Sequence, residues 1–265
     1  MNNIAIANET IKITADGFYE LGGKKIELPC EDASAFEIWA PEKGAALVES
    51  LVIPEGDMCS ITVTKEDSFT AASRFENAFV MNFANAHKAG GGFRLGANTQ
   101  EEALCRCSTL YASITSEAAG EMYRYNNTHL SSTESDYMLY SPNVCVFRNC
   151  GCELLEKPFT ASVITVPAPN RRGAAIFASN KKIAEAMTRR IRIMLAIAAK
   201  HGHRNIVLGA WGCGAFGNSS EDVAGYFRKV LIDEKYGQLF DNVCFAIYSS
   251  GNDKKYNIFS EAFSR

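Results

Sequence analysis

From about residue 50 onward, short apolar runs alternate with segments whose apolar residues recur every three or four positions. The runs are continuous, which is typical of strands buried on both faces of a largely parallel sheet. We predict strands at residues 61–64, 78–83, 144–147, 163–166, 206–209 and 243–248. Because helices are expected between them, the pattern predicts an α/β fold of three layers, α/β/α, around a mixed, largely parallel central sheet.

Three segments have helical spacing. Residues 100–115 place one apolar stripe along a predicted helix, at Leu104, Cys107, Tyr111 and Ile114. Residues 181–200 repeat this arrangement and stop at His201-Gly202, and residues 220–232 follow the last glycine-rich turn. The stretch 120–141 is rich in Ser, Asn and Tyr, and we predict a long surface loop there.

The first 50 residues have a different pattern. Residues 10–13, 17–21 and 26–28 are strand-like, and Gly22-Gly23 suits a hairpin turn. We therefore predict an N-terminal extension, residues 1–50, that packs on a functional domain of residues 51–265.

Composition narrows the classes of function. A net charge of −3 gives no reason to expect strong nucleic-acid binding, and no apolar run approaches the ~20 residues needed to span a bilayer. Nine cysteines, an odd number, favour reduced thiols and a cytoplasmic location. The spacing in Cys105-x-Cys107 and Cys150-x-Cys152 is shorter than is usual for structural zinc, so we predict no metal and no cofactor.

The first candidate for chemistry is a strand-to-helix junction with three consecutive glycines. Gly90, Gly91 and Gly92 follow Asn85 and precede the helix that opens at Gln100. Three glycines lose much backbone entropy on folding and need a reason. Either a ligand approaches the backbone closely, with N–H groups converging on its oxygens, or the glycines form a flexible connector.

Glu101 and Glu102 stand in the first turn of that helix. Thr99-x-x-Glu102 has the spacing of a capping box, the usual role of such a glutamate. Adjacent helical residues are separated by about 100°, so the two glutamates cannot both serve one cap. Burial and mutual repulsion would raise the pKa of the carboxyl that ionises second, and the helix N-terminus would oppose this. The sequence leaves open which effect is larger.

A second junction matches G-x-G-x-x-G between a strand and a helix. Its residues are Gly212, Cys213, Gly214, Ala215, Phe216, Gly217 and Asn218. The pattern is typical of a diphosphate at a helix N-terminus. Fewer than 50 residues follow Gly217, too few for the rest of a dinucleotide-binding fold, so a nicotinamide-dependent oxidoreductase is disfavoured. Phe216 can stack on the ligand or pack in the core.

Together these segments resemble the bacterial-type poly(ADP-ribose) glycohydrolases of the macrodomain superfamily. The signature of that family is three glycines, a short spacer and Gln-Glu-Glu, as in residues 90–92 and 100–102 here. Residues 140–148, 168–170 and 209–216 extend the resemblance over most of the chain from about residue 60. His87-Lys88-Ala89 departs from it, because a proline-containing run is expected there.

The resemblance implies a macrodomain-like fold that binds ADP-ribose, or poly(ADP-ribose) on modified macromolecules, and hydrolyses its glycosidic bonds. Glu102 would be the catalytic acid/base and Glu101 would position ribose hydroxyls. Asn85, Gln100 and the glycines 90–92 would bind the ribose side, and residues 212–218 the diphosphate. The two turns should then flank one crevice, with Glu102 pointing into it.

Two other functions stay open. The chain could hydrolyse mono-ADP-ribosyl linkages on protein or nucleobase, or it could bind ADP-ribose without catalysis. Glu101 and Glu102 argue against mere binding, because recognition of a dianionic diphosphate gains nothing from two extra negative charges.

Overall fold

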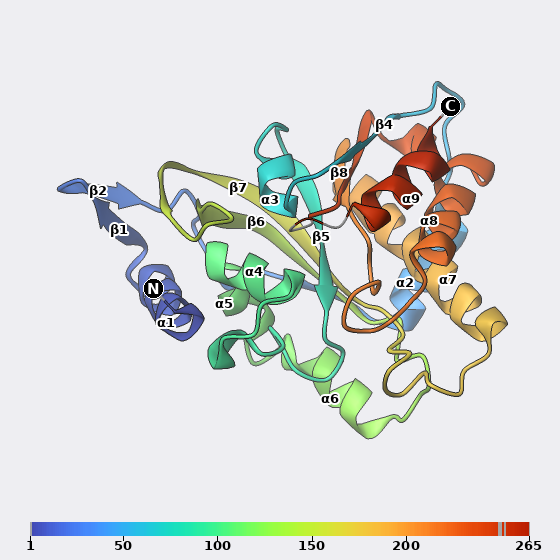
Figure 1. Ribbon diagram of the computed structural model, residues 1–265, viewed down its shortest axis with the longest axis horizontal. Helices are drawn as coiled ribbons and strands as arrows, with labels where there is room; N and C mark the ends of the chain where they lie inside the picture. Colours follow the sequence, from blue (N-terminus) through green and yellow to red (C-terminus); the bar gives the residue numbers. More distant parts are fainter. Residues whose placement is uncertain (1, 249–250, 252, 265) are drawn as a thin grey trace.

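The computed structural model describes residues 2–248, 251 and 253–264, and a seven-stranded sheet lies at its centre (Figure 1). The strands are β3 (Glu37–Trp39), β4 (Ser60–Thr64), β5 (Ala78–Ala84), β6 (Met138–Arg148), β7 (Leu154–Pro167), β8 (Asn205–Leu208) and β9 (Asn242–Ala246). Their order across the sheet is β3-β6-β7-β5-β8-β9-β4. From β7 to β4 all pairings are parallel, whereas β3-β6 and β6-β7 are antiparallel. The predicted mixed, largely parallel sheet is confirmed.

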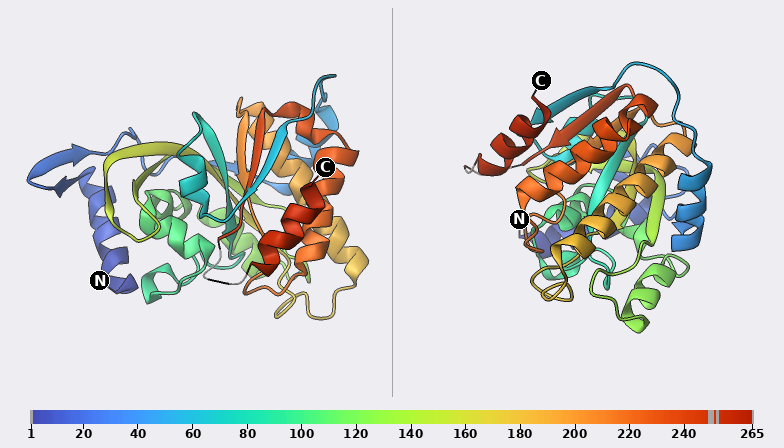
Figure 2. Two further views of the ribbon diagram at one scale, coloured as in Figure 1. Left: turned by 45° about the horizontal axis from the view of Figure 1, so that its top comes forward. Right: turned by 90° about the vertical axis from the view of Figure 1, so that its right-hand side faces the viewer.

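Helices cover both faces of the sheet (Figure 2). One layer contains α2 (Pro41–Ser50), α7 (Asn180–Lys200), α8 (Ser220–Arg228) and α9 (Lys254–Phe263). The other contains α1 (Asn3–Asp16), α3 (Ser68–Ala72), α4 (Gln100–Cys107), α5 (Leu110–Ile114) and α6 (Gly120–Thr128). Alternate residues of β5 point into two separate cores: Phe79 and Met81 pack in the first layer, Ala78 and Val80 in the second. The three-layer prediction is therefore confirmed.

The strand predicted at residues 10–13 is wrong, because these residues lie in α1. Ile6, Thr10 and Ile13 share one buried face of this helix. The Thr10 hydroxyl donates to the carbonyl of Arg106 at 2.7 Å and so joins α1 to α4. The β-branched residues favour a strand locally, and packing against α4 outweighs that preference. The hairpin that follows is confirmed, with β1 (Phe18–Leu21) and β2 (Lys24–Glu27) joined at Gly22-Gly23.

The division of the chain at residue 50 stays a prediction. Two elements before that position are already part of the central layers: β3 pairs with β6 at one edge of the main sheet, and α2 packs against α7. The β1–β2 hairpin forms a separate two-stranded sheet, which projects from the body of the molecule (Figure 1).

Two further predictions between residues 100 and 141 need correction. The helix expected over 100–115 is interrupted at Ser108, whose backbone is extended and bridges to Val146 of β6. The Ser108 hydroxyl donates to the carbonyl of Leu104 at 2.8 Å, and such local bonds compete with helix continuation. The surface loop expected over 120–141 contains α6 and the start of β6 instead. Asn126 stabilises this region, since its side chain donates to the carbonyl of Ala86 at 3.1 Å and accepts from the N–H of Ser135 at 3.0 Å.

None of the nine cysteines takes part in a disulfide bond. Within residues 2–248, 251 and 253–264, no three or more His, Cys, Asp or Glu side chains are grouped in a way that could hold a metal ion. In the same part of the chain, no helix has both the length and the apolar character needed to cross a membrane.

Candidate active site

The two glycine-rich turns leave neighbouring strands at the same edge of the sheet. β5 and β8 are adjacent and parallel, with Phe79 opposite Ile206. Their carboxyl ends therefore lie side by side, which is where open α/β sheets bind ligands. The turn with Gly90, Gly91 and Gly92 follows β5, and the turn with residues 209–217 follows β8.

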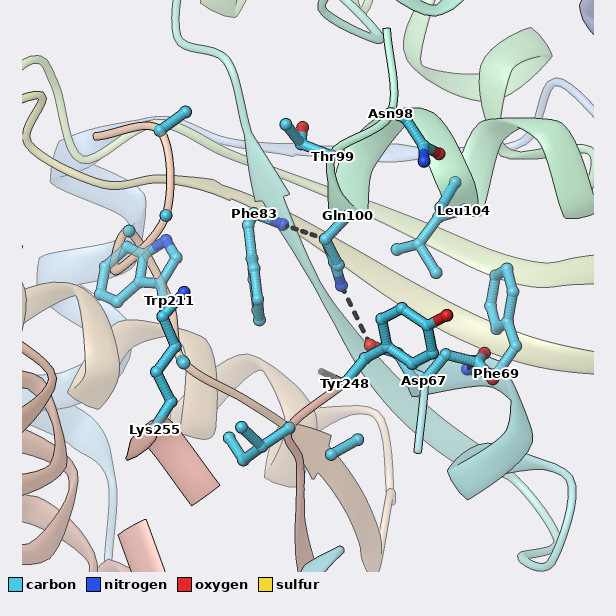
Figure 3. Close-up of a pocket in the computed structure, with 18 of the residues that line it drawn as sticks. Asp67, Phe69, Phe83, Asn98, Thr99, Gln100, Leu104, Trp211, Tyr248 and Lys255 are labelled. Atoms are coloured by element: carbon cyan, nitrogen blue, oxygen red, sulfur yellow. Dashed lines mark hydrogen bonds between the residues drawn. The ribbon is translucent and has the colours of Figure 1, made fainter. Parts of the chain in front are cut away.

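A cavity of about 430 Å³ opens at this edge. Thr99, Gln100 and Leu104 border it from the start of α4, and Trp211 and Phe216 border it from the second turn (Figure 3). The second turn also contributes Gly212, Gly214 and Ala215. The volume lies within the range of small-molecule and cofactor sites, roughly 300–1,000 Å³.

Glu102 uses its two carboxylate oxygens for two different purposes. Oε2 accepts from the backbone N–H of Thr99 at 2.9 Å and from the Thr99 hydroxyl, which completes the predicted capping box. Oε1 accepts from the backbone N–H of Gly92 at 2.9 Å. The carboxylate is therefore not confined to the cap of its own helix, because it also binds the glycine turn.

Glu101 points to the same turn from a deeper position. Its Oε2 accepts from the backbone N–H of Asn85 at 2.9 Å, and its Oε1 accepts from Nδ2 of Asn82 at 3.4 Å. A Cβ atom on Gly91 would lie 2.4 Å from Oε1 of Glu102 and 3.2 Å from Oε2 of Glu101. The two carboxyl groups thus converge on Gly91.

The side chain of Glu101 is only 2 % exposed. Burial raises the pKa of this carboxyl to about 8; the N–H of Asn85 works against the shift, and the charge of Glu102 adds to it. Burial therefore has a larger effect than the hydrogen bonds that stabilise the ionised form. At neutral pH Glu101 is mostly protonated and can donate a hydrogen bond.

The glycine turn is an ordered structure, which does not support the flexible-connector interpretation. Gly90 and Gly91 have φ angles of 66° and 53°, in the left-handed region that glycine enters without strain. The N–H of Gly91 donates to the carbonyl of Lys88 at 3.0 Å, and the N–H of Phe93 donates to that of Gly90 at 2.9 Å.

The polar side-chain atoms of several predicted substrate-binding residues form hydrogen bonds within the protein. Gln100 accepts from the N–H of Phe83 at 2.8 Å and donates to the carbonyl of Met81 at 2.8 Å, so it fastens α4 to β5 while it borders the cavity (Figure 3). Oδ1 of Asn85 accepts from the N–H groups of His87 and Lys88 at 2.8 Å and 3.0 Å.

Asn218 joins two loops: its Nδ2 donates to the carbonyls of Pro169 at 2.9 Å and Gly212 at 3.2 Å. Of the predicted second-turn residues, Cys213, Gly217 and Asn218 lie outside the lining of the cavity, as do both glutamates and the three glycines. Glu102 instead contacts the border of the cavity through Thr99, whose backbone N–H and hydroxyl donate to it.

The residues on one side of the cavity were not predicted from the sequence. Asp67 and Phe69 follow β4, and Tyr248 and Lys255 come from the end of the chain (Figure 3). Asp67 is also the N-cap of α3, where Oδ1 accepts from the N–H of Phe69 at 3.0 Å. The rule that ligands lie at the carboxyl ends of parallel strands points to Asp67 once β4 is known to pair with β9.

The run His87-Lys88-Ala89 holds the glycine turn against α6. Nδ1 of His87 lies 3.0 Å from Oδ1 of Asn127, and Nδ2 of Asn127 donates to the carbonyl of His87 at 3.0 Å. These contacts anchor the segment without a proline.

Comparisons with known proteins agree with this geometry. The family model "Microbial-type PARG, catalytic domain" matches residues 7–149. The chain is similar to the crystal structure of poly(ADP-ribose) glycohydrolase from Thermomonospora curvata, with 36 % identity over 98 % of this chain and 99 % of that chain and a TM-score of 0.92. The same enzyme bound to the inhibitor ADP-HPD gives 35 % identity, the same coverage and a TM-score of 0.88.

The poly(ADP-ribose) glycohydrolase of Deinococcus radiodurans in complex with ADP-ribose is also similar. Its identity is 34 % over 90 % of this chain and 99 % of that chain, and the TM-score is 0.83. No curated protein matches the chain.

Proposed function

The chain belongs to the family of microbial-type poly(ADP-ribose) glycohydrolase catalytic domains, and from this we propose that it hydrolyses the O-glycosidic ribose–ribose bonds of poly(ADP-ribose) and releases ADP-ribose. One observation carries the proposal: Glu101 and Glu102, both buried, converge on a glycine turn beside a cavity that a second glycine-rich turn lines. A protein that only bound the dianionic ligand would gain nothing from two carboxyl groups there.

Glu102 is the proposed acid/base of the reaction. In protonated form it donates to the 2′-oxygen that leaves as an oxocarbenium-like centre develops on the departing ADP-ribose. As a carboxylate it then takes a proton from the water that attacks the anomeric carbon, the change of role expected of such a group. Oε1 is the proposed reacting atom, because Oε2 is held by both donors of Thr99.

Glu101 is the proposed positioning group for the ribose. With a pKa of about 8 it carries a proton at neutral pH and can donate to a ribose hydroxyl. The backbone of Gly90, Gly91 and Gly92 supports the ribose, and residues 212–216 hold the diphosphate. Holding the sugar in register with Glu102 lowers the entropic part of the barrier.

The expected partner is ADP-ribose, or poly(ADP-ribose) attached to a modified macromolecule. The nine cysteines, none of which is in a disulfide bond, support a reducing compartment, and we place the protein in the cytoplasm on that ground.

The test combines one variant, one control and two measurements. Glu102→Gln should bind ADP-ribose within about twofold of the unchanged chain, yet hydrolyse labelled polymer ~10²–10⁴-fold more slowly, because it cannot exchange the proton. Glu156→Gln makes the same chemical change at an exposed position of β7 and should leave both measurements unchanged. Undiminished turnover by Glu102→Gln would exclude the acid/base role. Analysis of the product as free ADP-ribose separates polymer hydrolysis from action on mono-ADP-ribosyl linkages.

A further inference from the structure

The order of the strands indicates where the substrate continues beyond the bond that is cut. The cavity lies over the ends of β5, β8 and β9, and Ala168, the first residue after β7, also borders it. Glu101 lies toward the opposite neighbour of β5, since Nδ2 of Asn82 donates both to Glu101 and, at 3.1 Å, to Thr165 of β7. A substrate that fills the cavity and reaches the glutamates therefore lies against the segment that follows β7, whose first residue, Ala168, borders the cavity.

That segment, residues 168–173, is bound to the second glycine-rich turn. The N–H of Arg171 donates to the carbonyl of Phe216 at 2.9 Å, and Nδ2 of Asn218 donates to the carbonyl of Pro169 at 2.9 Å. The side chain of Arg172 covers Gly217, where a Cβ atom would lie 3.0 Å from its Nε. In Figure 1 this segment lies at the same edge of the sheet as the tip of β5. Two arginines are thus placed beside the diphosphate turn on a backbone that hydrogen bonds hold in position.

The charges of these two arginines are not neutralised by the part of the chain that the structure describes. Neither Arg171 nor Arg172 has a carboxylate within ion-pair distance among those residues, whereas Arg190 pairs with Asp136 and Arg192 with Glu234. Arg171 donates from Nη2 to the side-chain oxygen of Asn180 at 3.0 Å, and its Nε is buried without a partner. Because Arg171 and Arg172 are adjacent, they form a local positive charge on a chain whose net charge is −3.

We propose that Arg171 and Arg172 bind the diphosphate of the next ADP-ribose unit, the one whose 2′-oxygen leaves during hydrolysis. This inference rests on the proposed function, because only a polymeric substrate has such a unit. Each unit carries two negative charges, and guanidinium groups bind phosphate oxygens through paired hydrogen bonds. The terminal unit is held by backbone groups of the two turns, so the arginines add affinity for the polymer and little for free ADP-ribose.

The experiment compares polymer with monomer. Arg172→Glu should lower kcat/KM on poly(ADP-ribose) by about tenfold and leave the Kd for ADP-ribose within about twofold of the unchanged chain. The salt dependence of polymer binding should also weaken, by about one unit in the slope of log K against log salt concentration. Arg172→Gln, which removes only the charge, should show the same effects at smaller size.

Lys157→Glu is the matched control. Lys157 is exposed in β7 at the far end from the site, and its reversal changes the net charge by the same amount. Hydrolysis should be unchanged in this variant. An equal loss of ADP-ribose affinity in Arg172→Glu would show that the arginine contacts the terminal unit, and an unchanged kcat/KM on polymer would show that it contacts neither; both results overturn the inference.

A failure of the proposed function would be visible separately. In that case the unchanged chain would not shorten the polymer at all. Polymer binding can still be compared between Glu102→Gln and the double variant Glu102→Gln with Arg172→Glu, because this readout needs no turnover. Equal binding by the two proteins would overturn the inference on its own.

Discussion

Gly91→Ala should separate the position of Glu102 from its chemical identity. The substitution leaves both glutamates in the sequence and adds one methyl group where they converge. The new Cβ would lie 2.4 Å from Oε1 of Glu102, so the carboxylate must move. When it moves, it loses the hydrogen bond that it accepts from the N–H of Gly92 at 2.9 Å.

The magnitude follows from two costs. A residue with a Cβ in the left-handed region, where Gly91 has φ of 53°, costs about 1–2 kcal/mol. Loss of a hydrogen bond to a charged acceptor costs about 1.5–3 kcal/mol. Relaxation of the turn recovers part of each, so we expect the free energy of unfolding to fall by about 2–3 kcal/mol. Activity should fall further, because displacing a catalytic group by about 1 Å costs on the order of 100-fold in rate.

The assay measures kcat/KM on labelled poly(ADP-ribose) together with thermal and denaturant unfolding. Gly56→Ala is the control, because Gly56 is exposed, its φ lies outside the left-handed region, and a Cβ there would meet no atom within 4 Å. It should change neither measurement. If Gly91→Ala folded and kept kcat/KM within about threefold of the unchanged chain, the reasoning that Glu102 must occupy its observed position would be refuted.

Two further predictions follow from shifted pKa values. Burial, and to a smaller extent the charge of Glu102, raise the pKa of Glu101 from 4.5 to about 8. At a pH between these two values the folded chain therefore keeps a proton that the unfolded chain has released. The stability that Glu101 contributes should therefore decline, by up to a few kcal/mol, as pH rises from 4.5 to about 8. Glu101→Gln should remove this decline from a plot of Tm against pH, and an unchanged plot would show that other groups cause it. The neighbouring Cys107 thiol lowers the pKa of Cys152, which increases the fraction of Cys152 that is present as the reactive thiolate. Cys107→Ala should slow alkylation of Cys152 by iodoacetamide about threefold or more, as followed by mass spectrometry, and an equal rate would show that Cys107 is not the cause.

The parts of the fold that sequence analysis predicted are those with a long, regular local pattern. The helix expected over 181–200 is found at Asn180–Lys200, and the apolar runs of β4, β5 and β9 lie within two residues of their predicted bounds. Thr10 shows where this fails. Its segment is β-branched and yet helical, and its hydroxyl donates to the carbonyl of Arg106, 96 residues away. Such contacts leave no local signal.

The site divides in the same way. Spacing along the chain indicated Glu101 and Glu102 as candidate site residues, because the glycine turn and the start of the helix are neighbours in the sequence as well as in space. Asp67 and Tyr248 border the same cavity from opposite ends of the sequence, and only the pairing of β4 with β9 brings them together. Asn218 illustrates a different limit: its motif indicates a diphosphate turn, yet its side chain holds the backbone of that turn.

In the structure, the capping box and the three glycines are compatible with a catalytic role for Glu102. A cap and an acid/base compete for a glutamate only if the cap needs the whole carboxylate. Here the cap uses Oε2 of Glu102, and by fixing that oxygen to Thr99 it directs Oε1 toward Gly92. The space that Oε1 occupies is the space that a side chain on Gly91 would fill. The three glycines are therefore needed for a reason within the protein as well as for the approach of a ligand. The turn must leave room for the proposed acid, and the helix cap determines where that acid points.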